Sequence, residues 1–302
     1  MVSAKFHLFS LGSPVIYHGE DSLCGWFLQG YCCKILAMFI IQDSYIYRFV
    51  SKFSPGSLIR LIGKRIFKGC TIKQSFHNGV ICLDAVEHSW AWLGHSRYET
   101  FDRELQEKLL SLSKKYEIMI DIGCNIGAMA LYVVLKNPNI KAICIDPNSR
   151  AINLLNESMR INRLTHRVNT IKAAVSDKEG IINFDKVGSV MGHIDRLASP
   201  VKSISFTRLI NDYSFSARCL VKIDVEGFET VLMRQLSGLH NLNKLCLVVE
   251  LHPLKFNDFG NPKECLNLLL TTGAIVQDLK GQPISQVEEN KITQIIARWA
   301  YA

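Results

Sequence analysis

The chain of 302 residues is 48% hydrophobic and 21% charged, values that exclude a disordered or fibrous protein and are typical of a globular one. Its length is enough for one large α/β domain, or for one domain with an appendage. The 10 cysteines include no C-x-x-C pair, which argues against a zinc site or a dithiol redox motif and is typical of a protein of the reducing cytoplasm.

Residues 1–97 are expected to form an N-terminal extension, and residues 98–302 a single α/β domain. The N-terminus lacks the basic, apolar and small-residue regions of a signal peptide, so we expect a cytoplasmic protein. The most hydrophobic window, Gly25 to Ile41, is interrupted by Lys34 and is short for a membrane span. It therefore predicts a helix that packs on the domain or lies on a membrane surface.

Positive charge is concentrated in one part of this extension. The formal net charge is +8, and the stretch from Ser44 to Leu83 contains no acidic residue. Its basic residues all fall within residues 48–73: Arg48, Lys52, Arg60, Lys64, Arg65, Lys68 and Lys73. This asymmetry indicates an anionic partner, which would be a membrane surface, a glycolipid or other anionic glycan carrier, or nucleic acid. A solvated basic face explains the same charges equally well.

Two β-prone runs near the end of the extension predict a β-hairpin. Residues 70–74 and 80–83 flank Asn78-Gly79, and Asn-Gly between such runs is a strong hairpin signal. Upstream, a break at residues 54–57 precedes Leu58 to Phe67, whose apolar spacing predicts a short basic amphipathic helix.

From Thr100 onward, helical apolar patterns alternate with short apolar runs. Helices are predicted at residues 100–114, 126–136, 149–162, 227–236 and 262–271. Strands are predicted at residues 117–121, 141–146, 168–174, 181–184, 219–224, 245–250, 274–279 and 292–297, with a surface loop at 185–203. The alternation indicates a mostly parallel sheet of about seven strands, with right-handed crossovers and helices on both faces.

The clearest motif joins the first of these strands to its helix. The strand ends at Asp121, and a tight loop with Gly123 and Gly127 follows at the sheet edge where ligands of open α/β folds bind. The loop has no G-x-G-x-x-G pattern, but its D-x-G-x-x-x-G spacing resembles motif I of the Rossmann-like methyltransferases, which bind S-adenosylmethionine. Asp121, Gly123, Asn125 and Gly127 are therefore candidate cofactor-binding residues, and the loop amides are expected to meet the cofactor carboxylate. A plain strand-to-helix turn is the alternative.

Two later strand ends are expected to complete the cofactor site. Asp146 follows Asp121 by about 25 residues, where an acidic residue of nucleotide-binding α/β folds accepts hydrogen bonds from ribose hydroxyls. A helix-capping or loop carboxylate is the alternative reading. At the end of the third strand, Ala174 leaves room for a flat adenine ring, and Asp177 or a backbone N–H could meet the ring edge. A simple turn explains this last segment equally well.

The candidate catalytic residues follow the fourth and fifth long strands. Asp224, Glu226, Glu250 and His252 are expected to converge over one crevice, because parallel strands end at the same edge of a sheet. His252 is the first candidate for the base, since an unperturbed imidazole has a pKa near neutral pH, and Glu226 is the second. Asp224 is expected to orient the cofactor or the substrate.

Each of these assignments has a simpler alternative. His252 could cap a loop, and Glu226 could cap the following helix. For Glu229 the capping role is the preferred interpretation. No metal ligand is assigned, although the carboxylate cluster leaves a divalent ion open.

Taken together, the motifs resemble the FkbM family of methyltransferases over roughly residues 98 to 280. They are D-I-G-C-N-I-G at 121–127, D-P-N at 146–148, A-V-S-D at 174–177, K-I-D-V-E-G-F-E at 222–229 and V-E-L-H at 249–252. The fourth block is the most specific. Two positions depart from the family pattern: Asp146 stands where glutamate is usual, and Cys124 where alanine is frequent.

The resemblance implies a Rossmann-like methyltransferase fold and S-adenosylmethionine-dependent methylation, commonly at a hydroxyl of a sugar, glycan or natural product. It does not cover residues 1–97, which could hold the specificity for the substrate. Two alternatives remain: a module that binds S-adenosylmethionine or another nucleoside without catalysis, and a nucleic-acid methyltransferase. The chain has no N/D-P-P-Y/F block after the fourth strand, so nucleic acid is not the expected acceptor.

Overall fold

The computed structural model describes residues 16–17, 68–88, 91, 98–184, 199–253 and 259–300. The chain divides into two compact units, one made of Met1–Ser75 and Cys82–His95 and the other of Phe76–Ile81 and Ser96–Ala302. The hydrophobic window 25–41, the expected helix at 58–67 and most of the basic segment lie outside the described residues. In the part of the chain that can be described, no helix has the length and apolar character needed to cross a membrane.

The predicted hairpin is confirmed. Strand β2 (Thr71–Phe76) is followed by β3 (Gly79–Asp84), and the short β1 (Ile16–Tyr17) pairs antiparallel with β2. His77, at the turn, has a positive φ of 51°. The hairpin tip belongs to the second unit, where the side-chain oxygen of Asn162 accepts the N–H of Val80 at 2.9 Å.

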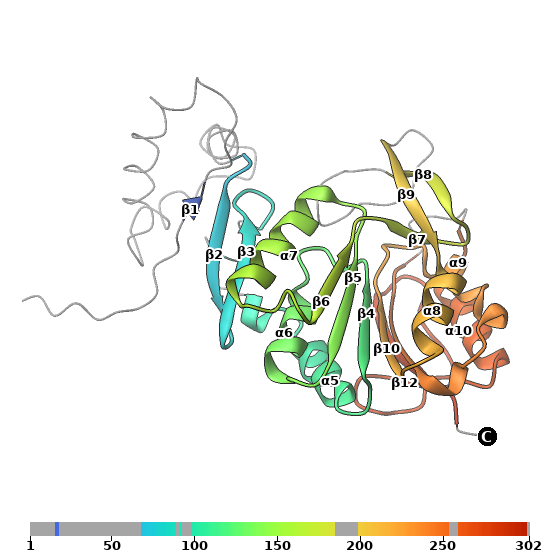
Figure 1. The fold of residues 1–302 in the computed structure, drawn as a ribbon. Coiled ribbons are helices and arrows are strands. Elements are labelled where there is room, and N and C mark those ends of the chain that lie inside the picture. The colour runs from blue at the N-terminus through green and yellow to red at the C-terminus, as the bar shows by residue number, and fades with distance from the viewer. Residues whose placement is uncertain are drawn as a thin grey trace, which may run out of the picture. The chain divides into compact units, whose positions relative to one another are not determined.

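The second unit is built on a seven-stranded sheet, as the alternating pattern predicts. Its order is β12-β13-β11-β10-β4-β5-β6 (Figure 1). The strands are β4 (Ile118–Ile122), β5 (Lys141–Ile145), β6 (Val168–Ile171), β10 (Cys219–Ile223), β11 (Leu245–Leu251), β12 (Ile275–Gln277) and β13 (Thr293–Arg298). Only β13 runs antiparallel to its neighbours β11 and β12, while the pairs from β11 to β6 are parallel. This is a Rossmann-like methyltransferase fold.

Helices cover both faces of this sheet (Figure 1). Helices α6 (Ala128–Lys136) and α7 (Ser149–Ile161) lie on one face, with α5 (Arg103–Ser113) beside α6. The other face carries α8 (Phe206–Ser214), α9 (Glu229–Met233) and α10 (Pro262–Thr271). Short 3₁₀ turns span Tyr98–Thr100, Leu236–Gly238 and Leu242–Lys244.

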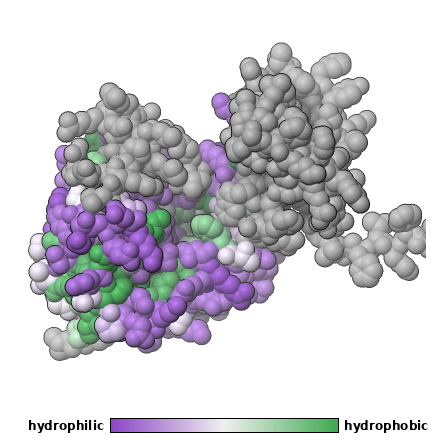
Figure 2. Space-filling view, turned by 180° about the vertical axis from the view of Figure 1, so that it is seen from behind, coloured by the Kyte–Doolittle hydropathy of each residue, from purple (hydrophilic) through white to green (hydrophobic). Residues whose placement is uncertain are grey.

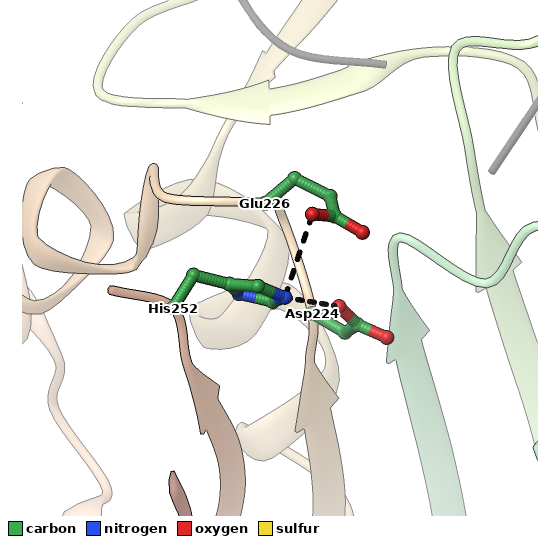
Figure 3. Close-up of side chains that lie close together, drawn as sticks. All are labelled: Asp224, Glu226 and His252. Atoms are coloured by element: carbon green, nitrogen blue, oxygen red, sulfur yellow. Dashed lines mark ion pairs between the residues drawn. The ribbon is translucent and has the colours of Figure 1, made fainter. Parts of the chain in front are cut away.

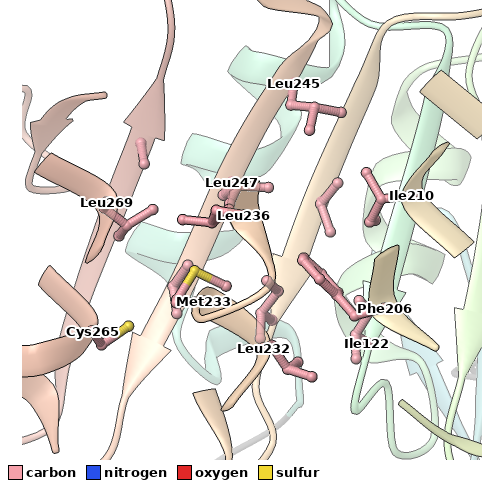
Figure 4. Close-up of a cluster of buried hydrophobic side chains, with 14 of the residues drawn as sticks. Ile122, Phe206, Ile210, Leu232, Met233, Leu236, Leu245, Leu247, Cys265 and Leu269 are labelled. Atoms are coloured by element: carbon pink, nitrogen blue, oxygen red, sulfur yellow. The ribbon is translucent and has the colours of Figure 1, made fainter. Parts of the chain in front are cut away.

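A hydrophobic core holds β4, β10 and β11 against the second of these helical layers. Phe206, Leu232 and Leu269 from the helices pack in one cluster with Ile122 and Leu247 from the strands (Figure 4). Each large apolar side chain that is fully buried contributes about 1.5–3 kcal/mol relative to an exposed one. The carboxyl ends of these three strands are therefore held in fixed positions. Away from the core, apolar residues on the face shown in Figure 2 are exposed in patches among polar ones.

Three sequence predictions need correction. The strand predicted at 168–174 is two strands, β6 in the main sheet and β7 (Ala174–Ser176) in a second sheet of order β7-β9-β8, where β8 spans Gly180–Phe184. The prediction of a loop at 185–203 is wrong for residues 199–203, because strand β9 (Ser199–Ser205) begins at Ser199. Strand β9 pairs parallel with β7, a long-range pairing that leaves little local signal.

The third correction concerns helices. Helix α8 was not predicted, although its buried residues Phe206, Leu209 and Ile210 follow helical spacing and Ser205 caps it. The helix predicted at 227–236 is shorter, because Gly227 has a φ of 104° and α9 begins only at Glu229.

Candidate active site

Three neighbouring strands bring the predicted residues to one edge of the main sheet. Strand β10 pairs in parallel with β4 on one side and with β11 on the other, so that Lys222 stands level with Asp121 and with Val248. Asp224 and Glu226 follow β10, while Glu250 and His252 lie at the end of β11. The expected convergence of these groups is therefore found.

The glycine loop after β4 is shaped by its neighbours. Gly123 has a φ of 74°, and a Cβ at this position would collide with the backbone carbonyl of Asp224. Gly127 has a φ of 72°, and a Cβ there would collide with the side chain of Leu155. Glycine is thus required at both positions by the fold itself, and at Gly123 it lets the loop touch the turn that carries Asp224.

Most of the loop amides already have acceptors in the protein. The N–H groups of Gly123 and Cys124 both donate to the carbonyl of Ile145, at 2.9 and 3.1 Å. The N–H of Asn125 donates to Asp146, and that of Gly127 to the carbonyl of Cys124. Among the described residues, the amide of Ile126 finds no acceptor, and it lies next to the first turn of α6. An anion would meet this amide and the start of α6 rather than the whole loop.

Asp146 acts as a loop carboxylate in this structure. One oxygen accepts the N–H of Asn125 and the other accepts the N–H of Asn148, both at 2.8 Å. Asn148 in turn caps α7. Burial raises the pKa of Asp146 to about 6, although the two amides partly oppose this. Each oxygen keeps a further lone pair, so contact with ribose stays a prediction that this geometry allows.

Asp121 and Lys222 form a buried ion pair beneath the loop. The side chain of Asp121 is 1% exposed, and its Oδ1 lies 3.5 Å from the Nζ of Lys222. The same Nζ lies 3.0 Å from Oδ2 of Asp224. Burial raises the pKa of Asp121. For Lys222, burial alone would lower the pKa, but the charges of Asp224 and Asp121 raise it overall, so the lysine stays charged.

The sequence analysis did not predict a role for Lys222. The signal that could have found it is a lysine inside the otherwise apolar run Cys219–Ile223, because a lysine is almost never fully buried without a partner.

His252 lies at the centre of a ring of carboxylates. Its Nδ1 lies 2.8 Å from Oε1 of Glu229, while its Nε2 faces Glu226 at 3.5 Å, Glu250 at 3.6 Å and Asp224 at 3.7 Å. Figure 3 shows the imidazole of His252 pointing between Asp224 and Glu226. Burial alone would lower the pKa of His252, but the hydrogen bond and charge of Glu229, with the charges of Asp224 and Glu226, raise it to about 9. The assumption of an unperturbed imidazole does not hold here.

Glu229 has two roles, and neither is the predicted capping of the helix. It is the first residue of α9, which has no side-chain cap, and its Oε1 accepts the N–H of Gly227, in the turn before the helix, at 3.0 Å. The same oxygen also orients His252. The second role depends on a residue 23 positions further along the chain, so sequence spacing did not reveal it.

Glu226 and Glu250 complete the ring. Glu226 has a positive φ of 52°, an uncommon conformation for a residue other than glycine, and its side chain is 28% exposed. Glu250 accepts a hydrogen bond at 2.8 Å from Nε2 of Gln294, which also donates to Asp102 at 2.7 Å. Burial raises the pKa of Glu250, and the charge of Asp224 adds to this.

The two residues expected at the adenine lie on the second sheet. Ala174 is buried at the start of β7, and Asp177 is exposed in the turn that follows. Their expected position at the end of a main-sheet strand is therefore revised, because the chain leaves that sheet after Ile171. Their contact with adenine stays a prediction.

Residues 102–187 match the family model described as the Methyltransferase small domain. The matched stretch contains the glycine loop and Asp146, and it ends before β10. The matched domain is that of an S-adenosylmethionine-dependent methyltransferase. A comparison with curated proteins finds no match.

Several solved structures are similar in fold. One is an O-methyltransferase family protein from Burkholderia thailandensis, with 9% identity, a TM-score of 0.40 and coverage of 67% of this chain and 57% of that one. A second is the precorrin-6y methyltransferase of Geobacter metallireducens, with 14% identity, a TM-score of 0.37 and coverage of 66% and 88%. A third is TYW2 of P. horikoshii in complex with MeSAdo, with 9% identity, a TM-score of 0.42 and coverage of 75% and 69%.

Proposed function

We propose that this S-adenosylmethionine-dependent methyltransferase is an O-methyltransferase of the FkbM type, and that its acceptor is a hydroxyl of a sugar, glycan or natural product. The observation that carries the proposal is the ring of Asp224, Glu226, Glu250 and His252 beside the glycine loop. Charged oxygen and nitrogen atoms at this edge suit an acceptor that must be held by hydrogen bonds and must lose a proton.

The donor side has groups that fit S-adenosylmethionine. The buried Oδ1 of Asn125 accepts no hydrogen bond from the described residues, so a donor group of a ligand would satisfy it. Asp146 would hold the ribose, and the Ile126 amide with the start of α6 would meet the carboxylate. The cofactor supplies an electrophilic methyl group on sulfur. Asp121 would act from beneath, by keeping Lys222 in place.

On the acceptor side, geometry divides the roles. The side chain of His252 is 3% exposed, while those of Glu226 and Asp224 are 28% and 27% exposed. An incoming hydroxyl would therefore reach the two carboxylates first. Asp224 is held by Lys222 and would orient the acceptor. Glu226 would receive the proton, because a pKa of about 9 keeps the imidazole of His252, the first candidate from the sequence, protonated near neutral pH. Most of the rate gain would come from holding oxygen, carbon and sulfur in line.

The test is incubation with methyl-labelled S-adenosylmethionine and a fractionated host extract. We expect alkali-stable label in a glycan or small-molecule fraction, and much slower labelling with Glu226→Gln. Glu104→Gln, an exposed change on α5, is the matched control. Label in RNA would favour the nucleic-acid alternative instead. If the protein binds S-adenosylmethionine but no fraction becomes labelled, the alternative of a binding module without catalytic activity would be favoured.

The basic segment at residues 48–73 supports a separate proposal, that the protein associates with an anionic membrane surface or a glycolipid. Within the described residues, Lys68 is exposed and Lys73 is half-buried. Flotation with anionic and neutral vesicles tests this, because electrostatic association requires the anionic lipid and weakens with salt.

A further inference from the structure

We propose that Asp224, Glu226 and His252 bind a divalent transition-metal ion at the ends of β10 and β11. Each residue offers one ligand atom, and these atoms all lie within 4.8 Å of one another. In Figure 3 the imidazole and the two carboxylates turn toward a common point. Binding of the ion does not depend on the proposed acceptor and can be measured without it.

The orientation of His252 is the independent observation that points to a ligand. Its side chain is 3% exposed, and its Nδ1 is engaged by Glu229 at 2.8 Å. The other nitrogen, Nε2, makes no hydrogen bond within the described part of the chain and is paired only by charge with carboxylates 3.5 to 3.7 Å away, so an ion bound there would take the place of its proton. Hydrogen bonds from N–H to oxygen are about 2.7–3.2 Å long. A histidine that binds a metal through one nitrogen usually has the other held by a carboxylate, as here.

The spacing of the ligand atoms suits an ion between them. Two atoms bound to one ion at about 2.1 Å, with an angle of roughly 90 to 110° between the bonds, lie about 3.0–3.4 Å apart. Nε2 of His252 lies 3.5 Å from Oε2 of Glu226 and 3.7 Å from Oδ1 of Asp224. Shifts of a few tenths of an ångström would bring these two pairs to that spacing, and the two carboxylate oxygens lie within 4.8 Å of each other.

The carboxylate of Asp224 is already divided between two tasks. Its Oδ2 accepts a hydrogen bond from Lys222 at 3.0 Å, while its Oδ1 faces His252. Lys222 thus leaves one oxygen of Asp224 for an ion. Second contacts of this kind orient the ligands of a metal and tune its affinity.

The chemistry of the ligands selects the class of ion. One imidazole nitrogen with two carboxylate oxygens suits Mn²⁺, Fe²⁺ or Zn²⁺ better than Mg²⁺ or Ca²⁺, which prefer oxygen alone. Three protein ligands leave coordination positions open, as in catalytic metal sites. If the proposed function holds, an acceptor hydroxyl bound there would lose its proton more readily, because a bound ion acts as a Lewis acid.

Charge balance points the same way. Among the described residues, the four carboxylates of Asp121, Asp224, Glu229 and Glu250 meet one lysine and one imidazole. Like charges at such distances disfavour one another unless a cation lies among them. A dication would offset the excess of negative charge.

The experiment uses the full chain, stripped with a chelator and then titrated with Mn²⁺ while the EPR signal of free Mn²⁺ is followed. We expect one Mn²⁺ per chain, displaced by Zn²⁺, and a nitrogen modulation in the spin echo that His252→Ala removes. Asp224→Asn and Glu226→Gln should weaken binding more than tenfold. Glu229→Gln, which acts through His252, should weaken it about 10–100-fold. Glu104→Gln should bind as the parent does.

Thermal unfolding and cofactor affinity check that each variant folds, and Glu226→Gln, at the most exposed ligand, is the variant expected to fold best. Mn²⁺ binding without the nitrogen signal, or unchanged in all three ligand variants, would overturn the proposal. So would the absence of binding both with and without S-adenosylmethionine. If the protein transfers methyl groups but binds no ion in the titration, the metal-site proposal is wrong and the proposed O-methyltransferase function still stands. If it binds the ion but labels no acceptor, the metal site stands and the proposed function is wrong.

Discussion

The two halves of the site are built differently. Around the glycine loop, the structure relies on backbone groups: the amides of Gly123, Cys124 and Asn125 all donate to atoms of β5 or of the residue after it. Around β10 and β11, it relies on charged side chains, with His252 facing four carboxylates. The half proposed to bind the methyl donor, called the donor half below, is therefore held by backbone hydrogen bonds, whereas the half proposed to bind the acceptor, the acceptor half, is held by a balance of charge.

The largest effect on stability is expected from a substitution of Lys222, which holds the carboxylates of Asp121 and Asp224. Lys222→Met should lower the free energy of unfolding by about 3–5 kcal/mol, because it leaves a buried carboxylate without its cation. Denaturant unfolding measures this. Lys141→Met, on the exposed start of β5, is the matched control and should change little. Adding Asp121→Asn to Lys222→Met should restore part of the loss; no recovery would mean that Asp121 is not the stranded charge.

A substitution at Gly123 tests whether the conformation of the glycine loop depends on its close contact with the turn that carries Asp224. Gly123→Ala should destabilise the fold by about 2–4 kcal/mol and weaken cofactor binding, because the methyl group meets the backbone of Asp224 at a positive φ. Gly273→Ala has a similar φ of 79° with nothing near its Cβ. It should cost only about 1 kcal/mol. Equal losses of stability would show that backbone strain, and not the contact between the two turns, decides the effect.

Asp146 sharpens the assignment of the donor half. Asp146→Asn should weaken S-adenosylmethionine binding by about 1–3 kcal/mol, since ribose hydroxyls would lose a charged acceptor. Calorimetry on both proteins measures the difference. Asp177→Asn, at the exposed turn after β7, should have a smaller effect. An Asp146→Asn protein with parental affinity would remove Asp146 from the ribose site.

The pKa of Asp146, raised to about 6, predicts a pH dependence with opposite signs for binding and stability. Cofactor affinity should fall by up to about tenfold as pH drops from 8 to 5, because the protonated carboxyl is a weaker acceptor. The contribution of Asp146 to folding runs the other way: it is fully present below the unfolded pKa and is lost as pH rises through about 6. Calorimetry and unfolding at several pH values test both, and Asp146→Asn should flatten both profiles. A parent profile that Asp146→Asn does not change would assign the titration to another group.

Much of the fold was determined by local patterns. The strand, loop and helix from Ile118 to Lys136 and the Asn-Gly hairpin could be predicted, because hydrophobic periodicity and turn residues act within a few positions. The convergence of Asp224, Glu226 and His252 could also be predicted, since parallel strands that alternate with helices end at one edge. Helix α8 carried a local signal as well, in Ser205 and the spacing of Phe206, Leu209 and Ile210, and could have been found.

Other features were decided only by tertiary structure. The place of β9 depends on its pairing with β7, in which Ala174 lies opposite Ser203, 29 positions later in the chain, and local propensity does not encode such a pairing. The pairing of Lys222 with Asp121 and of Glu229 with His252 requires adjacent strands and a helix start to meet. The protonation of His252 depends on burial and on the charges of Glu229, Asp224 and Glu226, which come from three separate positions in the chain. Residue types and their order along the chain were thus enough to predict that these side chains meet at one edge of the sheet, while their protonation follows from distances that only the folded sheet sets.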